Sequence, residues 1–144
     1  MKLVMFSLAI ALSLGFGCHK SSESSMTGES ATAGAQQAAE SWLALVDQGK
    51  YDESWTESAK IFQSGVDQEK WHQMVGAVRG PLGTLVSRKL KSADFKTSLP
   101  GAPDGKYVVI QYDTSFANRS GAVETITPMV DTDGKWKVSG YFIR

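Results

Sequence analysis

The apolar residues of this chain recur at helical spacing in its first half and at alternate positions in much of its second half. The longest helical stripe lies within residues 31–49, where apolar residues follow the i, i+3, i+4, i+7 rule through Trp42, Leu43 and Val46. Gly49 follows directly, and glycine suits the left-handed residue that often ends a helix. The pattern therefore predicts one amphipathic helix that ends at Gly49.

Two shorter stripes follow and predict two more helices. The second helix is expected over residues 52–62, with its apolar side chains facing inward. Asp67 then begins a third helix, because an aspartate before an apolar stripe caps free backbone N–H groups. Its predicted buried stripe comprises Trp71, Met74, Val75 and Val78. A cation, a glycine and a proline over residues 79–81 predict its end.

The second half of the chain predicts four β-strands. Residues 82–95 alternate poorly and carry a basic run, which indicates an edge strand. Prolines and glycines predict a loop over 99–105. Three more strands lie within 105–144, separated by turns near 118–121 and 131–134. The order predicts an α+β fold in which three N-terminal helices pack on one face of a curved four-stranded antiparallel sheet.

The two predicted turns decide which side chains share a face of the sheet. With even-numbered loops, Tyr112 pairs with Thr127 between the second and third strands. The helix-facing side then holds Val108, Ile110, Tyr112, Phe116, Val123, Met129, Trp136, Val138 and Phe142. An odd loop with a bulge at the second turn would reverse the last strand instead. The pattern leaves both arrangements open.

The opposite face of the sheet is expected to be too apolar for simple exposure to water. Its predicted members include Val109, Glu124, Ile126, Tyr141 and Ile143. Two explanations remain open. The face either binds a second copy or another protein, or it is partly covered by the 99–105 loop and the Ser-rich segment near the N-terminus.

Aromatic residues suggest a second candidate site, between the helices and the sheet. Tyr112, Trp136 and Trp71 are expected to point into this space, where they would line a small apolar pocket. Aromatic residues at such spacing more often form a packed core. Both a pocket and a packed core remain open, and the packed core is the favoured interpretation.

The residue chemistry gives little support for catalysis or for metal binding. No nucleophile and base can be paired from the sequence. His72 has no second histidine or cysteine at ligand spacing, so no metal and no cofactor is expected. An acid–base set of Glu124, Asp113, Tyr112 and His72 is the alternative, but the predicted register turns Glu124 and Asp113 away from the helices. No catalytic residue is therefore assigned.

The first 18 residues predict export from the cytoplasm. A lysine at position 2 precedes an apolar run, and small residues follow, as in a secretory signal peptide. The run is shorter than the ~18–20 residues that a membrane span needs. The segment ending at Cys18 is a partial match to a bacterial lipobox, because Leu14 lies one place upstream of the usual leucine.

These features predict where the protein resides. We expect lipidation of Cys18, which would anchor the protein to a bacterial membrane at the periplasm or cell envelope; plain cleavage and secretion is the alternative. Residues 19–30 are polar and rich in serine, which predicts a flexible tether. Residues 31–144 are then a single α+β domain. No other cysteine is available for a disulfide.

The charge of the chain argues against nucleic-acid binding. It contains 15 basic and 15 acidic residues, and the basic residues are spread along the sequence. A nucleic-acid-binding protein normally shows a basic patch or stripe. We therefore expect partners other than nucleic acid.

Four segments carry a resemblance to a known family: AAESWLALVDQGKYDESW, RGPLG, SLPGAPDGKYVVIQYDTSF and VETITPMVDTDGKWKVSGYFIR. Together they resemble the family named domain of unknown function 4019, which implies a small exported bacterial protein without an assigned activity. The order of elements also resembles the nuclear transport factor 2-like and cystatin-like folds. We expect a non-enzymatic binding or interaction module, with a small-ligand carrier or an acid–base enzyme as the alternative.

Overall fold

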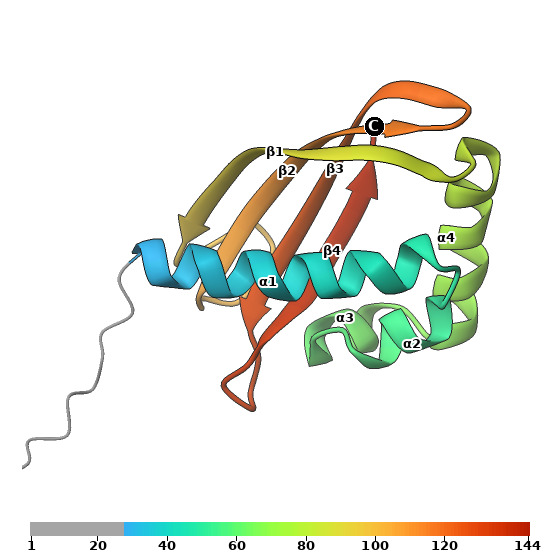
Figure 1. The fold of residues 1–144 in the computed structure, drawn as a ribbon. Helices are drawn as coiled ribbons and strands as arrows, with labels where there is room; N and C mark the ends of the chain where they lie inside the picture. The colour runs from blue at the N-terminus through green and yellow to red at the C-terminus, as the bar shows by residue number, and fades with distance from the viewer. Residues whose placement is uncertain (1–27) are drawn as a thin grey trace, which may run out of the picture.

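The computed structural model describes residues 28–144, which form four helices and one four-stranded antiparallel sheet (Figure 1). The helices are α1 (Gly28–Asp47), α2 (Tyr51–Thr56), α3 (Lys60–Gly65) and α4 (Gln68–Leu82). The strands are β1 (Leu85–Lys96), β2 (Tyr107–Phe116), β3 (Arg119–Val130) and β4 (Trp136–Ile143). The α+β class and the four antiparallel strands are confirmed, whereas the prediction of three helices is wrong.

Helix α1 lies across one face of the sheet, which we call the inner face (Figure 1). It begins at Gly28, three residues before the predicted start, and it ends as predicted. Gly49 has a φ of +74°, its N–H donates to the Val46 carbonyl at 3.1 Å, and the Lys50 N–H donates to the Leu45 carbonyl at 2.9 Å. This pair of bonds is the glycine-ended motif that satisfies the last carbonyls of a helix.

The predicted helix over 52–62 is in fact two helices, α2 and α3. The chain breaks at Ala59, whose backbone is extended with a ψ of 152°. The Ala59 N–H donates to the carbonyl of Val138 on β4 at 2.8 Å. The break therefore lets this segment cover part of the edge of the sheet, which a continuous helix would not do.

Helix α4 begins as predicted, because the side chain of Asp67 accepts a hydrogen bond from the Lys70 N–H at 2.8 Å. It continues through Pro81 to Leu82, beyond the predicted end, and Gly83 with a φ of +76° ends it. Trp71 and Val75 are buried, but Met74 and Val78 are 52% and 48% exposed. Because α4 packs mainly against α2, its predicted apolar stripe is only half covered.

The strands run in the order β1-β2-β3-β4, so β1 and β4 are the two edges of the sheet. This confirms β1 as an edge strand. The core lies between α1 and the inner face and includes Ala35, Ala39, Trp42, Leu43, Val46, Trp71, Val75, Val108, Ile110, Tyr112, Ile126 and Val138. On the outer face, Tyr107 is buried and its hydroxyl donates to the Pro103 carbonyl at 2.7 Å. The 99–105 loop therefore covers part of that face.

The predicted register between β2 and β3 is wrong. Tyr112 pairs with Glu124 rather than with Thr127. The hairpin between β2 and β3 has a two-residue loop after Phe116. Next to this loop, β3 contains one more residue than the facing part of β2, at a bulge near Gly121, which has a φ of +70°. A glycine at positive φ is the usual residue of such a bulge. The extra residue reverses the side chains of β3, so that Glu124 faces the core, whereas Val123 and Met129 lie on the outer face.

A second bulge reverses the end of β4. Trp136 and Val138 face the helices as predicted, but the register shifts at Pro128 of β3. Proline has no N–H to donate to a neighbouring strand, so a regular ladder cannot continue there. The Ser139 hydroxyl instead donates to the Thr127 carbonyl at 2.7 Å. As a result Tyr141 and Ile143 lie on the inner face, whereas Phe142 lies on the outer face and is 55% exposed.

Candidate binding groove and the ion cluster beside it

A cluster of four charged side chains, of which Arg79 and Glu124 are buried and Asp47 and Arg88 partly buried, lies at the end of the inner face. Asp47 comes from α1, Arg79 from α4, Arg88 from β1 and Glu124 from β3. We call these four residues the ion cluster. Their formal charges sum to zero, since two carboxylates face two guanidinium groups. The cluster thereby links one helix end, a second helix and two strands.

Glu124 is fully buried, and both of its carboxylate oxygens are occupied. Arg88 donates to Oε2 from Nε at 2.6 Å and to Oε1 from Nη2 at 3.1 Å. The Thr114 hydroxyl donates to Oε2 at 2.7 Å, and the Tyr141 hydroxyl donates to Oε1 at 2.6 Å. Such charge-assisted and forked bonds are the strong ones in proteins.

Asp47 forms the other half of the cluster. Its two oxygens accept bonds from Arg88 at 2.7 and 3.0 Å, and Oδ1 also accepts one from Arg79 at 2.7 Å. Burial alone would raise the pKa of the Asp47 carboxyl, but these hydrogen bonds and the two positive charges outweigh it and lower the pKa below its usual value. Asp47 is therefore firmly ionised at neutral pH.

The two guanidinium groups are also fixed in their charged form. Burial opposes the charge of Arg88, and its hydrogen bonds to Asp47 and Glu124 overcome this effect and raise its pKa. The pKa of Arg79 is raised in the same way, through Tyr141 and Asp47. Burial and the neighbouring Glu124 raise the pKa of the Tyr141 hydroxyl. These shifts favour the ionised forms of Asp47, Arg79 and Arg88 at neutral pH, so the cluster is suited to holding elements together.

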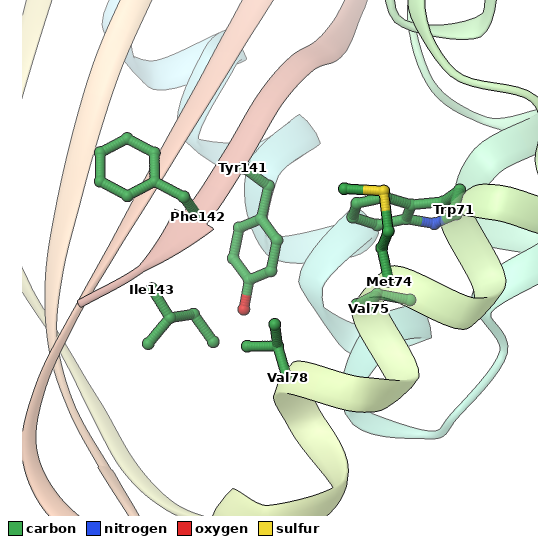
Figure 2. Close-up of a pocket in the computed structure, with 7 residues that line it drawn as sticks. All are labelled: Trp71, Met74, Val75, Val78, Tyr141, Phe142 and Ile143. Atoms are coloured by element: carbon green, nitrogen blue, oxygen red, sulfur yellow. The ribbon is translucent and has the colours of Figure 1, made fainter.

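An apolar groove of about 210 Å³ lies between α4 and β4 (Figure 2). We call it the α4–β4 groove. Seven residues line it: Trp71, Met74, Val75, Val78, Tyr141, Phe142 and Ile143. Figure 2 shows Tyr141 and Ile143 extending toward α4, with Phe142 directed away from it. Tyr141 belongs to both features, because its ring lines the groove while its hydroxyl enters the ion cluster.

The backbone of β4 beside the groove is an open strand edge. Val123 and Arg144 exchange two backbone bonds, at 2.8 and 3.0 Å, so the backbone of Arg144 faces β3. Backbone groups alternate in direction along an antiparallel strand. The N–H and C=O groups of Tyr141 and Ile143 therefore point to the free edge, where residues 28–144 supply them with no hydrogen-bond partner.

Residues 38–141 match the family described as protein of unknown function (DUF4019). The chain belongs to this family. The match covers most of the domain and confirms the resemblance seen in the sequence. No curated protein matches the chain.

In this family member the three residues predicted to line a pocket do not meet. Trp71 lines the α4–β4 groove and packs edge-on against Phe62 with ring centres 5.0 Å apart. Trp136 lies near the other end of α1, next to Gly34. Tyr112 is buried in the core, where burial and the negative charge of Glu40 raise its pKa to about 12. The packed-core interpretation fits Tyr112 best.

The five residues predicted to form an interface on the outer face do not share that face. Val109 lies there, half-buried. Glu124, Ile126, Tyr141 and Ile143 lie on the inner face instead, because the bulges in β3 and β4 reverse their side chains. Ile126 is part of the core and Tyr141 packs against it, so neither is available to an interface on the outer face.

The alternative acid–base set is not assembled either. His72 forms an exposed pair with Asp52 at 2.8 Å, and Asp113 forms an exposed pair with Lys91 at 3.2 Å on the outer face. Residues 28–144 contain no group of three potential metal ligands. In the same range, none of the helices combines the length and apolar character that a membrane span requires. Cys18, the predicted signal peptide and most of the predicted tether lie outside the described residues.

Neither the ion cluster nor the open edge of β4 is evident from the sequence pattern. By local pattern Arg79 is a cation at a helix end and Arg88 belongs to the basic run of an edge strand. One sequence feature does signal that Tyr141 and Ile143 lie on the inner face. Pro128 lies inside a segment that otherwise predicts a central strand, and such a proline marks a bulge.

Proposed function

We propose that this protein is a membrane-tethered, non-enzymatic binding module of the bacterial cell envelope, with the α4–β4 groove as its binding site. The observation that carries the proposal is the groove itself. Met74, Val78 and Phe142 leave about half of their side-chain surface exposed around it, beside an open strand edge. Exposed apolar surface of this kind is typical of interaction sites.

Export and anchoring are supported by the N-terminal sequence. The signal-like segment that ends at Cys18 suits lipidation there, and the polar residues after it suit a tether. Replacing Cys18 with serine should release the full-length protein from the membrane fraction. Unchanged partitioning of Cys18→Ser would refute the anchor, while leaving the groove proposal standing.

The position of the groove fits a tethered binding protein. The tether joins the domain at Gly28, at the start of α1. Trp42, which contacts both Trp71 and Tyr141 of the groove, lies about 20 Å further along this helix at a rise of ~1.5 Å per residue. The groove is therefore displaced from the point where the tether is attached, which leaves it accessible to a partner protein.

The ion cluster argues against acid–base catalysis. Glu124 is buried beside a tyrosine, as in some cavity enzymes, but all of its hydrogen-bonding capacity is used by Arg88, Thr114 and Tyr141. A general base needs an open lone pair within reach of a substrate proton. The likeness to nuclear transport factor 2-like and cystatin-like folds remains an expectation and adds no catalytic group.

A small-ligand carrier is also less well supported. The groove is smaller than the ~300–1,000 Å³ that ordinary ligand pockets occupy, and it is open along one side. It has room for one or two apolar side chains of another protein. We therefore favour a protein partner.

The groove can be tested by NMR with the full-length protein, or with the Cys18→Ser protein released from the membrane. The ligand is a capped phenylalanine, N-acetylphenylalaninamide. Titration with this compound should give saturable chemical-shift changes at the amides of Val75, Val78 and Ile143. Val78→Asp should weaken this binding about tenfold or more, because it places an unpaired carboxylate against apolar surface. Val86 is 67% exposed on β1, at the opposite edge, so Val86→Asp is the matched control. Shifts scattered over the surface, or equal effects of the two variants, would contradict the proposal.

A further inference from the structure

We propose that the α4–β4 groove takes an extended segment of a partner protein, which adds to β4 as a fifth strand and carries acidic residues on either side of an apolar centre. This inference rests on the proposed binding function and names the kind of partner. Three features carry it: the open backbone of β4, the size of the groove and the charges at its ends.

The open backbone groups define where a strand can add. The first half of the β4 edge is already covered, because the Ala59 N–H donates to the Val138 carbonyl. Beyond the bulge at Ser139, the N–H and C=O groups of Tyr141 and Ile143 face outward without partners among residues 28–144. An extended segment pairing there would form main-chain hydrogen bonds along this short stretch, as in β-strand addition.

The apolar surfaces lie on the two sides of this edge, as an added strand requires. Alternate side chains of a strand point to opposite faces of a sheet. Side chains on the inner face would enter the groove between Tyr141 and Val78, and the side chain between them would lie beside Phe142 on the outer face. The volume of about 210 Å³ suits one or two such side chains.

The charges at the ends of the groove favour acidic flanks. Lys70 lies one turn before Met74 on α4. Arg144 follows Ile143, and its pairing with Val123 places its side chain on the outer face, the same face as Phe142, at the end of the open edge. Both are exposed, and neither side chain has an ionic partner within residues 28–144. Strand β4 contains no carboxylate. On α4, Glu69 lies on the side of the helix opposite the groove-lining positions and accepts a bond from Gln73, and the carboxylate of Asp67 is engaged in capping the helix. An apolar segment with acidic ends would complement this arrangement.

The same charges disfavour a second copy at this edge. Antiparallel pairing of two β4 strands would bring Arg144 and Lys70 of both copies to the same interface. Strand β4 has no carboxylate that could offset these positive charges. Like charges brought together at an interface oppose association. The partner strand is therefore expected to come from a different protein.

The test uses synthetic peptides with the domain intact. The probe is the capped peptide Glu-Thr-Val-Thr-Val-Thr-Glu, and its controls are the same peptide with lysine at both ends and one with N-methylated valines. The acidic probe should slow amide hydrogen exchange at Tyr141 and Ile143. It should bind about tenfold more tightly than the lysine peptide, since exposed charge pairs each contribute only modestly. N-methylation should abolish binding.

A variant of β4 separates strand pairing from simple apolar contact. Ile143→Pro removes an N–H that faces the free edge and is not used by β3, so the sheet should persist while peptide binding falls at least tenfold. Ile143→Val keeps the N–H and is the matched control. If Ile143→Pro disturbs the fold, the N-methylated peptide still gives the decisive comparison.

The outcomes distinguish this inference from the proposed function. If capped phenylalanine binds the groove but N-methylation has no effect on the peptide, strand addition is wrong and the binding function stands. Equal affinity for the acidic and lysine peptides overturns the charge preference. A dimer in sedimentation that Ile143→Pro dissociates would assign the edge to a second copy. If neither probe binds at the groove, both proposals fail.

Discussion

The Tyr141 hydroxyl donates a 2.6 Å hydrogen bond to Glu124, a carboxylate with no exposed surface, while the ring of the same tyrosine forms part of the α4–β4 groove. The floor of the groove is thus fixed by the ion cluster. Arg79, which reaches the cluster from α4, fixes the opposite wall. The shape of the groove therefore depends on residues that a ligand would not touch.

Removing this hydroxyl should destabilise the domain. Tyr141→Phe takes one donor from a buried carboxylate, and hydrogen bonds to charged groups contribute about 1.5–3 kcal/mol. We expect a loss of about 2 kcal/mol in the free energy of unfolding, measured by urea denaturation. A loss below about 0.5 kcal/mol would indicate that the bond to Glu124 is unimportant.

Breaking the cluster at Arg88 should be more damaging. Arg88→Met removes one of the two cations that Asp47 and Glu124 share and leaves Arg79 alone with both carboxylates. Removing one partner of a buried ion pair costs about 3–5 kcal/mol. Lys91→Met is the control, because the Lys91–Asp113 pair is exposed and such pairs contribute at most about 1 kcal/mol. Similar losses in the two variants would contradict the role assigned to the cluster.

The stability of the domain should fall in acid through Asp47. Because its folded pKa is lowered, its contribution is complete above the ordinary carboxyl pKa of about 4 and is lost as the pH falls through the folded value. Asp47→Asn should therefore be less stable at pH 7, and its stability should depend less on pH below about 4. If the free energy of unfolding of the wild type and of Asp47→Asn falls with the same slope in acid, this assignment to Asp47 is wrong.

Tyr112 should make the stability of the domain fall at high pH. Its pKa is raised to about 12, so the stability it contributes is complete below the ordinary tyrosine pKa of about 10 and is lost as the pH rises toward 12. Its buried hydroxyl has no hydrogen-bond partner among residues 28–144. Tyr112→Phe should therefore be neutral or slightly stabilising at pH 7 and should flatten the loss between pH 10 and 12. A loss of more than about 1 kcal/mol at pH 7 would reveal a missing partner.

The sequence was sufficient for α1, α4, the four strands and much of the core, but not for the break between α2 and α3. Local rules decide these features: Asp67 caps α4, Gly49 ends α1, and alternation places Ile110 and Tyr112 on the inner face. The family assignment also followed from the sequence. These features depend on residues that are close together along the chain.

The site could not be predicted in the same way, because two bulges decide it. Gly121 and Pro128 each shift the register by one residue, and one residue is enough to move a side chain to the other face. Glu124, Tyr141 and Ile143 therefore face inward, contrary to the prediction. The partners of Glu124 come from distant parts of the chain, and no local pattern joins Arg79 or Arg88 to it.

The most direct test of the central claim is photo-crosslinking from the groove in intact bacterial cells. A benzophenone amino acid is placed at Val78 of the full-length protein, with the same substitution at exposed Val86 as the control. The proposal predicts a discrete adduct from position 78 alone, whose crosslinked peptide, identified by mass spectrometry, maps to one apolar segment with acidic flanks. Absence of an adduct at position 78, or the same adducts from both positions, would contradict the assignment of the groove as the binding site.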